Sequence, residues 1–335
     1  MMHKKERWLY YSVISIGILA LVYFLGPIPD YKPVTDELPT LNLNTDNVEE
    51  YVNEKEDQFN IRPNNEARII WDNDSLNNKT NWCVLYLHGF SASWYEGHPV
   101  HTNLGREVGA NVYLSRLHDH GIDKKDALID MQPGKLYDSA KEALLIARAL
   151  GDSIIVVSTS TGGTLSLQLA ADFPEQVNML VLLSPNIAIN DPAAFLLGGP
   201  WGLQIARLSD GGSKFRDLGT APDVEEKYWY QKYRWEGTVY LKHLVDITMN
   251  QNTFEKVTQP VFLGYYYKND EEQDPVVRVD AMLDMYQQLR TSEENKKKIA
   301  FPDAGRHVIG CESTSNSYKK VETEIIKFVK EQIKP

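Results

Sequence analysis

A serine, an aspartate and a histidine stand at three points of this sequence where an apolar run gives way to small or polar residues. Ser160 follows an apolar run at 153–157, and Asp274 and His307 each come after a later run. A serine hydroxyl becomes a strong nucleophile when a neighbouring base removes its proton. Histidine is the usual base, and a carboxylate orients it. These residue types therefore point to acyl transfer through a Ser-His-Asp triad.

Ser160 stands between a buried-strand pattern and a helical pattern, with small residues at Ser158, Gly162 and Gly163. This context is typical of a nucleophile that is held on a sharp strand-to-helix turn. Ser158 is the alternative nucleophile. Its own neighbours at the same spacing would include Val156, whose branched side chain fits poorly at a crowded turn. We therefore identify Ser160 as the candidate nucleophile.

The triad requires elements that bring the three side chains to one edge of a sheet. From about residue 67, strand patterns alternate with helical patterns, and each strand is nearly continuous in apolar residues. This alternation predicts a mostly parallel sheet with helices on both faces. In such sheets, ligands bind at the carboxyl ends of the strands. Side chains that follow three different strands can therefore meet there.

The chain order serine, aspartate, histidine is the order that α/β-hydrolases use. The sequence resembles this superfamily over about residues 67–330, and within it the small carboxylesterases and the monoacylglycerol-lipase-like or lysophospholipase-like enzymes. Arg116-Leu117-His118-Asp119-His120-Gly121 also looks like the family's Pro-Gly-His-Gly segment. The motifs that carry the resemblance are His88-Gly89-Phe90, the turn at 158–163, Asp274-Pro275-Val276-Val277 and Gly305-Arg306-His307.

The resemblance implies an oxyanion hole formed by two backbone N–H groups, those of Phe90 and Thr161. Such donors would face the oxygen that becomes negative in the tetrahedral intermediate. His88 is expected to shape the loop rather than act as a base. The family's turn usually begins with glycine, and Ser158 takes that place here. Serine is small enough to fit.

Asp274 is the expected triad acid because two valines follow it closely, as in the family. Asp270, in the same acidic loop, is the alternative. The resemblance implies no cofactor and no metal. His118 and His120 could bind a metal in principle, but no third ligand is near them in the sequence, so we interpret them as loop structure.

The beginning of the chain has a different character from the rest. Residues 8–25 are uncharged and mostly apolar, about long enough to span a bilayer, and aromatic residues flank them. Lys4, Lys5 and Arg7 precede this run. The positive-inside rule then predicts a cytoplasmic N-terminus and an extracytoplasmic catalytic domain. We expect a retained transmembrane anchor at 8–28; the alternative is a cleaved signal peptide and a secreted enzyme.

The other boundaries follow from composition. Residues 1–7 would form a cytoplasmic N-terminus. Residues 29–65 are polar, acidic and interrupted by prolines, which predicts a juxtamembrane linker with one short helix at about 46–59. The hydrolase domain would occupy residues 66–335. Within it, the alternation stops at about 190–259, where glycines and large aromatic residues predict a helical cap inserted over the active site.

Charge and cysteine content exclude several other classes of protein. The formal net charge of −11 offers no basic face for a nucleic acid. The two cysteines, Cys83 and Cys311, exclude a disulfide framework. They are expected near opposite ends of the sheet, too far apart to form a disulfide.

The sequence thus predicts a membrane-anchored serine hydrolase that cleaves carboxylic esters through an acyl-enzyme. An aromatic cap on a tethered domain favours substrates with an acyl chain, such as monoacylglycerols or lysophospholipids. Hydrolysis of an amide, a thioester or a carbon–carbon bond by the same triad is the alternative. A non-catalytic binding module on a hydrolase scaffold would predict a degraded triad, whereas all three positions are filled. No feature of the sequence indicates an oligomeric state.

Overall fold

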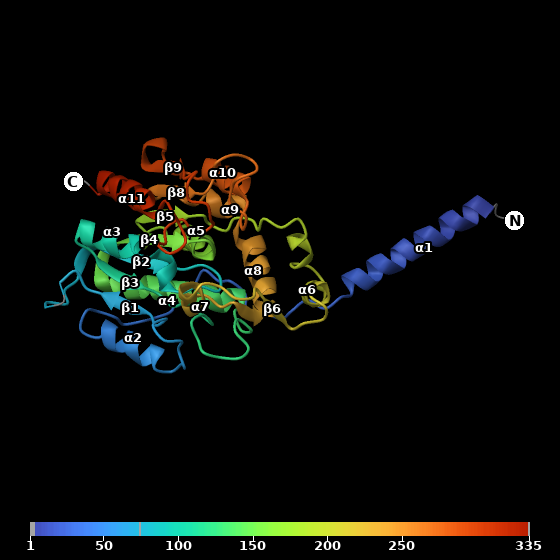
Figure 1. Cartoon of the computed structure of the whole chain (residues 1–335), viewed down its shortest axis with the longest axis horizontal. Helices are drawn as coiled ribbons and strands as arrows, with labels where there is room; N and C mark the ends of the chain where they lie inside the picture. Colours follow the sequence, from blue (N-terminus) through green and yellow to red (C-terminus); the bar gives the residue numbers. More distant parts are fainter. Residues whose placement is uncertain (1–3, 74, 334–335) are drawn as a thin grey trace.

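A sheet of seven strands lies at the centre of the folded domain (Figure 1). The computed structural model describes residues 4–73 and 75–333. The strands are β1 (Arg68–Ile70), β2 (Thr80–Leu87), β3 (Asn111–Leu114), β4 (Gly151–Thr159), β5 (Met179–Leu183), β8 (Val261–Tyr265) and β9 (Lys296–Ala300). Their order is β1-β3-β2-β4-β5-β8-β9, and only the edge strand β1 is antiparallel to its neighbour. The mostly parallel sheet that the sequence predicts is confirmed.

Two hydrophobic cores cover the two faces of the sheet. Along β4, Ile154 and Val156 belong to one core, and Ile155 and Val157 belong to the other, as side-chain alternation in a strand requires. Because both faces are covered, the buried parts of the central strands β2, β4, β5 and β8 are mostly apolar. The first core includes α4 (Pro133–Leu150), α5 (Thr161–Asp172), α8 (Trp235–Thr248) and α10 (Val279–Gln288), and the second includes α3 (Val100–Val108) and α11 (Tyr318–Gln332).

The segment that we expected to interrupt the alternation lies between β5 and β8. It contains short helices and a two-stranded antiparallel sheet, with α8 joining it to the first core. Figure 1 shows α6 and β6 of this segment at the end of the domain from which the N-terminal helix projects. Its elements before α8 are η2 (Ala194–Leu196), α6 (Gly202–Ser209), β6 (Phe215–Asp217), α7 (Asp223–Tyr228) and β7 (Lys232–Arg234), and α9 (Gln251–Phe254) follows α8.

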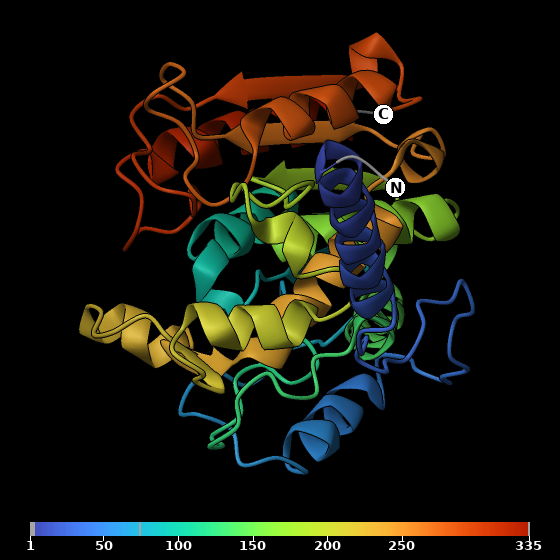
Figure 2. The same ribbon diagram turned by 90° about the vertical axis from the view of Figure 1, so that its right-hand side faces the viewer.

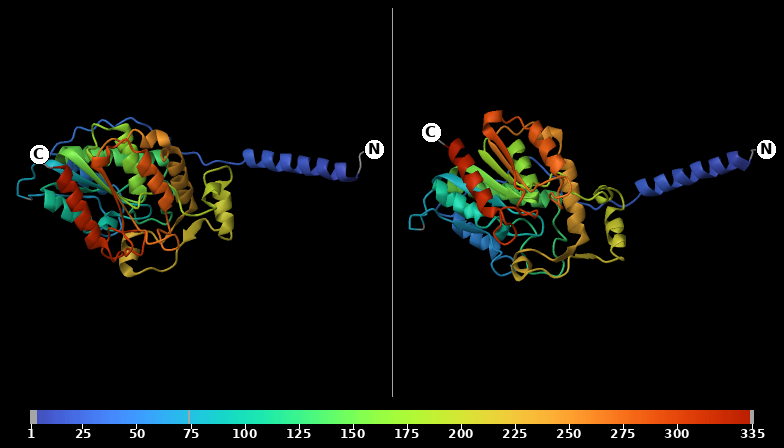
Figure 3. Two further views of the ribbon diagram at one scale, coloured as in Figure 1. Left: turned by 90° about the horizontal axis from the view of Figure 1, so that it is seen from above. Right: turned by 45° about the horizontal axis from the view of Figure 1, so that its top comes forward.

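The N-terminal helix α1 (Lys4–Phe24) projects away from the domain (Figures 1 and 3). Its window from Arg7 to Phe24 is long and apolar enough to cross a membrane, and none of that window is buried in the protein. The end of α1 touches the segment between β5 and β8, because the Trp201 indole N–H donates to the Val22 carbonyl at 3.0 Å. The backbone N–H of Trp201 donates to the Pro27 carbonyl, also at 3.0 Å.

Residues 29–65, which we expected to form a linker, pack along the side of the domain (Figure 2). Helix α2 (Val48–Glu56) buries Val48 and Val52 in the first core. The Tyr31 ring also packs against that core, with its centroid 3.9 Å from the centroid of His243. Only residues 25–30 separate Tyr31 from the end of α1. The packed part of the chain thus begins near Tyr31, ahead of the boundary predicted at residue 66.

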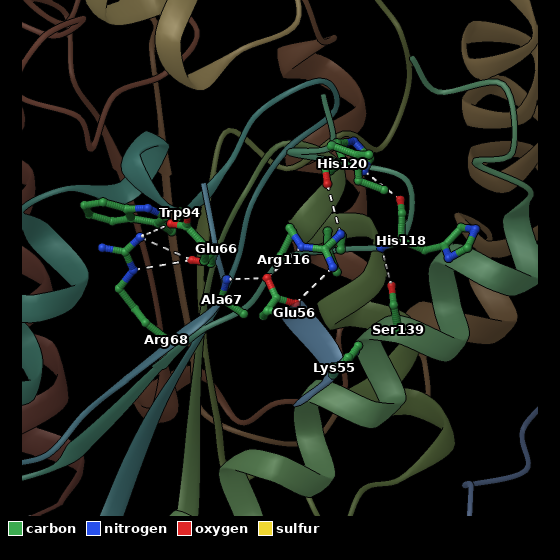
Figure 4. A network of polar contacts seen from close by, with 12 residues as sticks. Lys55, Glu56, Glu66, Ala67, Arg68, Trp94, Arg116, His118, His120 and Ser139 are labelled. Atoms are coloured by element: carbon green, nitrogen blue, oxygen red, sulfur yellow. Dashed lines mark hydrogen bonds and ion pairs between the residues drawn. The ribbon is translucent and has the colours of Figure 1, made fainter. Parts of the chain in front are cut away.

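A buried ion pair ties α2 to the loop after β3 (Figure 4). The Arg116 guanidinium donates to both carboxylate oxygens of Glu56, at 2.7 and 3.0 Å. Glu56 also accepts the backbone N–H of Ala67 at 2.8 Å, and Arg116 donates to the His120 carbonyl at 3.1 Å. The two charged side chains are only 3% and 8% exposed, and the Arg116 guanidinium lies over the Phe59 ring. Hydrogen bonds therefore satisfy a pair that water does not reach.

Replacement of Glu56 by alanine is expected to lower the free energy of unfolding by about 3–5 kcal/mol, because it leaves the Arg116 charge buried without a partner. Chemical unfolding of the full chain in detergent measures this loss. Glu66→Ala is the matched control, since the side chains of the Glu66–Arg68 pair are 30–43% exposed and ion pairs that water reaches contribute about 0–1 kcal/mol. Equal losses for the two variants would show that Glu56 does not hold the domain together.

Candidate active site

The turn between β4 and α5 holds Ser160 in a conformation that non-glycine residues seldom adopt. Its φ and ψ are 55° and −117°, and a positive φ in such a residue stores strain that the surroundings must maintain. A Cβ at Gly162 would lie 2.0 Å from the Leu87 carbonyl oxygen, and one at Gly163 would lie 2.5 Å from the Pro185 Cβ. Only glycine fits these two positions, which explains the small residues in the sequence.

Ser158, the alternative nucleophile, lies within β4 and is fully buried. Its hydroxyl donates weakly to the Val181 carbonyl of the neighbouring strand, at 3.4 Å. Ser160, in contrast, stands at the carboxyl end of β4, the edge where the triad was expected.

The loops after β8 and β9 bring Asp274 and His307 together. The Nδ1 of His307 donates to one carboxylate oxygen of Asp274 at 2.7 Å. The other oxygen accepts the backbone N–H groups of Val276 and Val277 at 2.9 and 3.1 Å. The two valines that identified Asp274 in the sequence thus donate their backbone N–H groups to its carboxylate. Asp270 is exposed and accepts the Tyr267 hydroxyl instead, so it is not the partner of His307.

Burial and charge act in opposite directions on this pair. Burial lowers the pKa of His307, but the Asp274 charge and their hydrogen bond outweigh this effect and hold the pKa above its usual value. Burial likewise raises the pKa of Asp274, and the His307 charge overcomes it, so that the carboxyl pKa stays below its usual value. The Nε2 of His307 is buried and has no hydrogen-bond partner among the described residues. That nitrogen is available to accept a proton.

The loop after β2 lies directly beside Ser160. A Cβ at Gly89 would lie 3.0 Å from the Ser160 Cβ, which places the next residue, Phe90, close to the nucleophile. Thr161 begins α5, so its N–H belongs to the positive end of a helix dipole. Within residues 4–73 and 75–333, neither the Phe90 nor the Thr161 N–H donates to a protein acceptor. Both N–H groups are thus without a protein acceptor in the described parts of the chain.

His88 shapes this loop, as its sequence position suggested. Its Nδ1 donates to the Gly89 carbonyl at 2.9 Å, and its Nε2 accepts the Leu117 N–H at 3.1 Å. Burial lowers the pKa of His88 to about 4, which keeps the ring neutral. His120 packs beside it, with ring centroids 5.0 Å apart, while His118 pairs with Asp130. In the described parts of the chain, no group of three histidine, cysteine or acidic residues could hold a metal ion.

Glu96 lies near the site but was not predicted from the sequence. Glu96 lies in the short helix η1 (Trp94–Gly97) and is 2% exposed. Its carboxylate accepts the Gly89 N–H at 2.5 Å and the Tyr86 hydroxyl at 3.3 Å. The only sequence signal was an acid within the aromatic stretch Trp94-Tyr95-Glu96, eight residues after His88. That signal is too weak without the fold.

A cavity of about 330 Å³ borders His307. The segment between β5 and β8 forms one wall, and the loops after β8 and β9 form the others. Its apolar lining is Leu218, Trp229, Val276 and Val308. A larger cavity, of about 650 Å³, lies between residues 32–59 and α4 and includes no member of the Ser160, Asp274 and His307 set. The smaller cavity is therefore the one that adjoins the candidate site.

The two cysteines lie in different parts of the fold. Cys83 and Cys311 are both free and buried. Cys83 lies on β2, and burial raises the pKa of its thiol. The Cys311 thiol donates to the Tyr95 carbonyl at 3.4 Å, close to Glu96.

Comparisons with known proteins agree with this fold. A sequence model described as "Alpha/beta hydrolase family" matches residues 84–310. A structure described with the metagenome-derived lipolytic enzymes LipS and LipT is 14% identical, has a TM-score of 0.65, and is matched over 81% of this chain and 99% of that one. The monoacylglycerol lipase of Paleococcus ferrophilus is 13% identical, with a TM-score of 0.57 and coverages of 78% and 97%.

A soluble variant of the Saccharomyces cerevisiae monoglyceride lipase is also similar. It is 12% identical, has a TM-score of 0.56, and is matched over 79% of this chain and 91% of that one. At these identities the likeness shows the fold alone. No curated protein sequence matches the chain significantly.

Proposed function

This chain belongs to the alpha/beta hydrolase family, and from that premise we propose that it is a serine hydrolase of carboxylic esters. Ser160 would be the nucleophile, His307 the base, and Asp274 the acid that orients the base. The observation that carries the proposal is the 2.7 Å hydrogen bond from His307 to Asp274, at the sheet edge where the strained Ser160 turn ends β4. Structural neighbours that are lipases and esterases support ester hydrolysis.

In the proposed reaction, the Ser160 Oγ attacks the ester carbonyl while the Nε2 of His307 takes the hydroxyl proton. The carbonyl oxygen becomes negative and accepts the N–H groups of Phe90 and Thr161. His307 then returns the proton to the leaving alcohol, and the acyl group remains on Ser160. A water molecule, deprotonated by the same nitrogen, attacks the acyl-enzyme and releases the carboxylic acid. No cofactor or metal takes part.

Esters with one acyl chain are the substrates that we propose. The cavity of about 330 Å³ beside His307 has both apolar and polar side chains in its lining, and Leu218, Trp229, Val276 and Val308 are among the apolar ones. Its volume lies at the small end of the usual range for ligand sites. In this proposal the segment between β5 and β8 is a cap whose Leu218 and Trp229 contact the chain. Monoacylglycerols and lysophospholipids have this form.

A series of p-nitrophenyl esters of increasing acyl length tests the substrate class. We expect kcat/KM to rise at least about tenfold from acetyl to a medium chain, because each buried CH₂ contributes up to about 0.8 kcal/mol. A matched thioester and anilide of the best acyl group compare the alternative chemistries. A preference for acetyl, or faster anilide cleavage, would overturn the assignment. A binding module without catalysis would cleave none of them.

The N-terminal helix supports a location at the membrane. We propose that α1 is a retained anchor, with residues 1–7 in the cytoplasm and the catalytic domain on the other side. The support is the exposed apolar surface of α1 and the basic residues at its N-terminal end. Secretion after cleavage of a signal peptide is the alternative. Mass spectrometry of the protein from the membrane fraction distinguishes the two, because only a retained anchor leaves residues 8–28 attached.

A further inference from the structure

Glu96 is a buried acid beside the triad to which the proposed mechanism gives no role. An ionised carboxyl is costly to bury unless a cation or several hydrogen bonds offset the lost hydration. Glu96 accepts two hydrogen bonds, from the Gly89 N–H and the Tyr86 hydroxyl. In the described parts of the chain, no lysine or arginine forms an ion pair with it. A positive charge that stabilises the ionised Glu96 would therefore have to come from a residue other than lysine or arginine.

The position of Gly89 shows how close Glu96 lies to the nucleophile. A point at the Cβ position of Gly89 is 2.8 Å from a carboxylate oxygen of Glu96 and 3.0 Å from the Cβ of Ser160. A Cβ atom at position 89 would therefore touch both the acid and the nucleophile. The loop that carries His307 packs against η1, because the Cys311 thiol donates to the carbonyl of Tyr95, the residue before Glu96, at 3.4 Å. In this arrangement the charges of Glu96 and His307 each shift the pKa of the other.

The ionisable groups around Glu96 come from two parts of the fold. Tyr86 lies on β2, and His307 and Cys311 lie in the loop after β9. Tyrosine and cysteine become negative when they ionise, so they can only repel the Glu96 charge. His307 is the one neighbour in this set that becomes positive. It does so at the step when Ser160 loses its proton.

We propose that Glu96 is a second acidic partner of His307, in addition to Asp274. Its carboxylate stabilises the imidazolium that forms as Ser160 attacks, and its bond to the Gly89 N–H holds the loop that carries the Phe90 oxyanion donor. Glu96 touches neither substrate nor reacting atoms in this role and is a positioning residue. The inference rests on the proposed serine hydrolase function.

The protonation of Glu96 fits this role near neutral pH. Burial raises the pKa of the Glu96 carboxyl, and its hydrogen bonds and the His307 charge only partly offset this, which leaves it at about 7. Two groups that interact this closely titrate as a pair. The carboxyl is therefore ionised above about pH 7, where it favours a proton on His307, and it becomes neutral in acid.

Glu96→Gln in the full-length protein tests the proposal. The amide oxygen can still accept the Gly89 N–H, so this variant removes the charge and keeps the shape. With a p-nitrophenyl ester as substrate, we expect kcat/KM to fall about tenfold at pH 8, a factor that corresponds to about 1.4 kcal/mol of transition-state stabilisation. The loss should disappear by pH 5, where the wild-type carboxyl is itself neutral. Release of acid followed in a pH-stat gives rates at both pH values.

Three further variants keep the test decisive. Glu312→Gln removes a nearby exposed acid that pairs with His98 and should leave the pH profile unchanged. Glu96→Asp keeps the charge and should keep the wild-type profile even if its rate is lower. A loss for Glu96→Gln that is the same at every pH, or no loss at all, would show that Glu96 only holds the loop and would overturn the proposal. A wild-type protein as inactive as Ser160→Ala would instead reject the serine hydrolase function itself.

Discussion

Replacement of Ser160 by alanine is expected to reduce kcat for ester hydrolysis by about 10⁶-fold, the loss typical of removing the nucleophile from a triad. The residual rate would come from the oxyanion donors and from substrate binding, which do not need the hydroxyl. The fold should survive, because the change removes one oxygen at a turn that Gly162 and Gly163 shape. Steady-state kinetics and labelling with a fluorescent fluorophosphonate measure the loss.

Ser158→Ala is the matched control for this experiment. Ser158 lies two residues earlier on β4, is fully buried, and makes one weak hydrogen bond to the neighbouring strand. Its variant should label with the fluorophosphonate and keep kcat within a few-fold of wild type. If Ser160→Ala still turned over esters while Ser158→Ala did not, the nucleophile would have to be reassigned to Ser158.

Replacement of Asp274 by asparagine is expected to lower kcat by about 10⁴-fold. The amide cannot stabilise the imidazolium, and it favours the wrong tautomer of His307. The loss should be accompanied by a change in the pH profile. His307 acts as a base only when neutral, and the Asp274 charge raises its pKa, so the wild-type rate rises through a midpoint above the usual histidine value. Removal of that charge moves the midpoint to lower pH.

Asp270→Asn distinguishes this effect from a general change in the acidic loop. Asp270 lies four residues before Asp274 in the same loop, and its exposed carboxylate accepts the Tyr267 hydroxyl. Its variant should keep both the rate and the midpoint of the pH profile. A large loss for Asp270→Asn together with a small one for Asp274→Asn would exchange the two assignments.

The sequence allowed the sheet and the turn at Ser160 to be predicted because both depend on local pattern. A strand covered on two faces needs an uninterrupted apolar run, and the crowded turn needs glycine where backbone and side chains approach within 3 Å. The motif with two valines also selected Asp274 over Asp270. In each case the residues that decide the structure lie within a few positions of one another.

The short helix at about 46–59 was predicted and α2 lies within it. Glu96 and the packing of α2 against the domain could not be predicted in this way, because their partners are distant in sequence. The surroundings of Glu96 are formed by Tyr86, Gly89 and His307, which are far from it or from one another in the sequence and which only the fold brings together. In α2, the two buried valines are surrounded by acidic residues that are typical of a linker. What places α2 on the domain is Arg116, sixty residues beyond its partner Glu56.

The short connection between α1 and Tyr31 has a consequence for kinetics. A chain extends by at most about 3.6 Å per residue, so the seven steps from Phe24 to Tyr31 keep the domain within about 25 Å of the end of α1. With α1 as the proposed anchor and a lipid as the proposed substrate, enzyme and substrate would meet by lateral diffusion in two dimensions. The rate then depends on the mole fraction of substrate in the membrane. Diluting the substrate with an inert lipid would slow turnover even when the amount of substrate in the sample is constant.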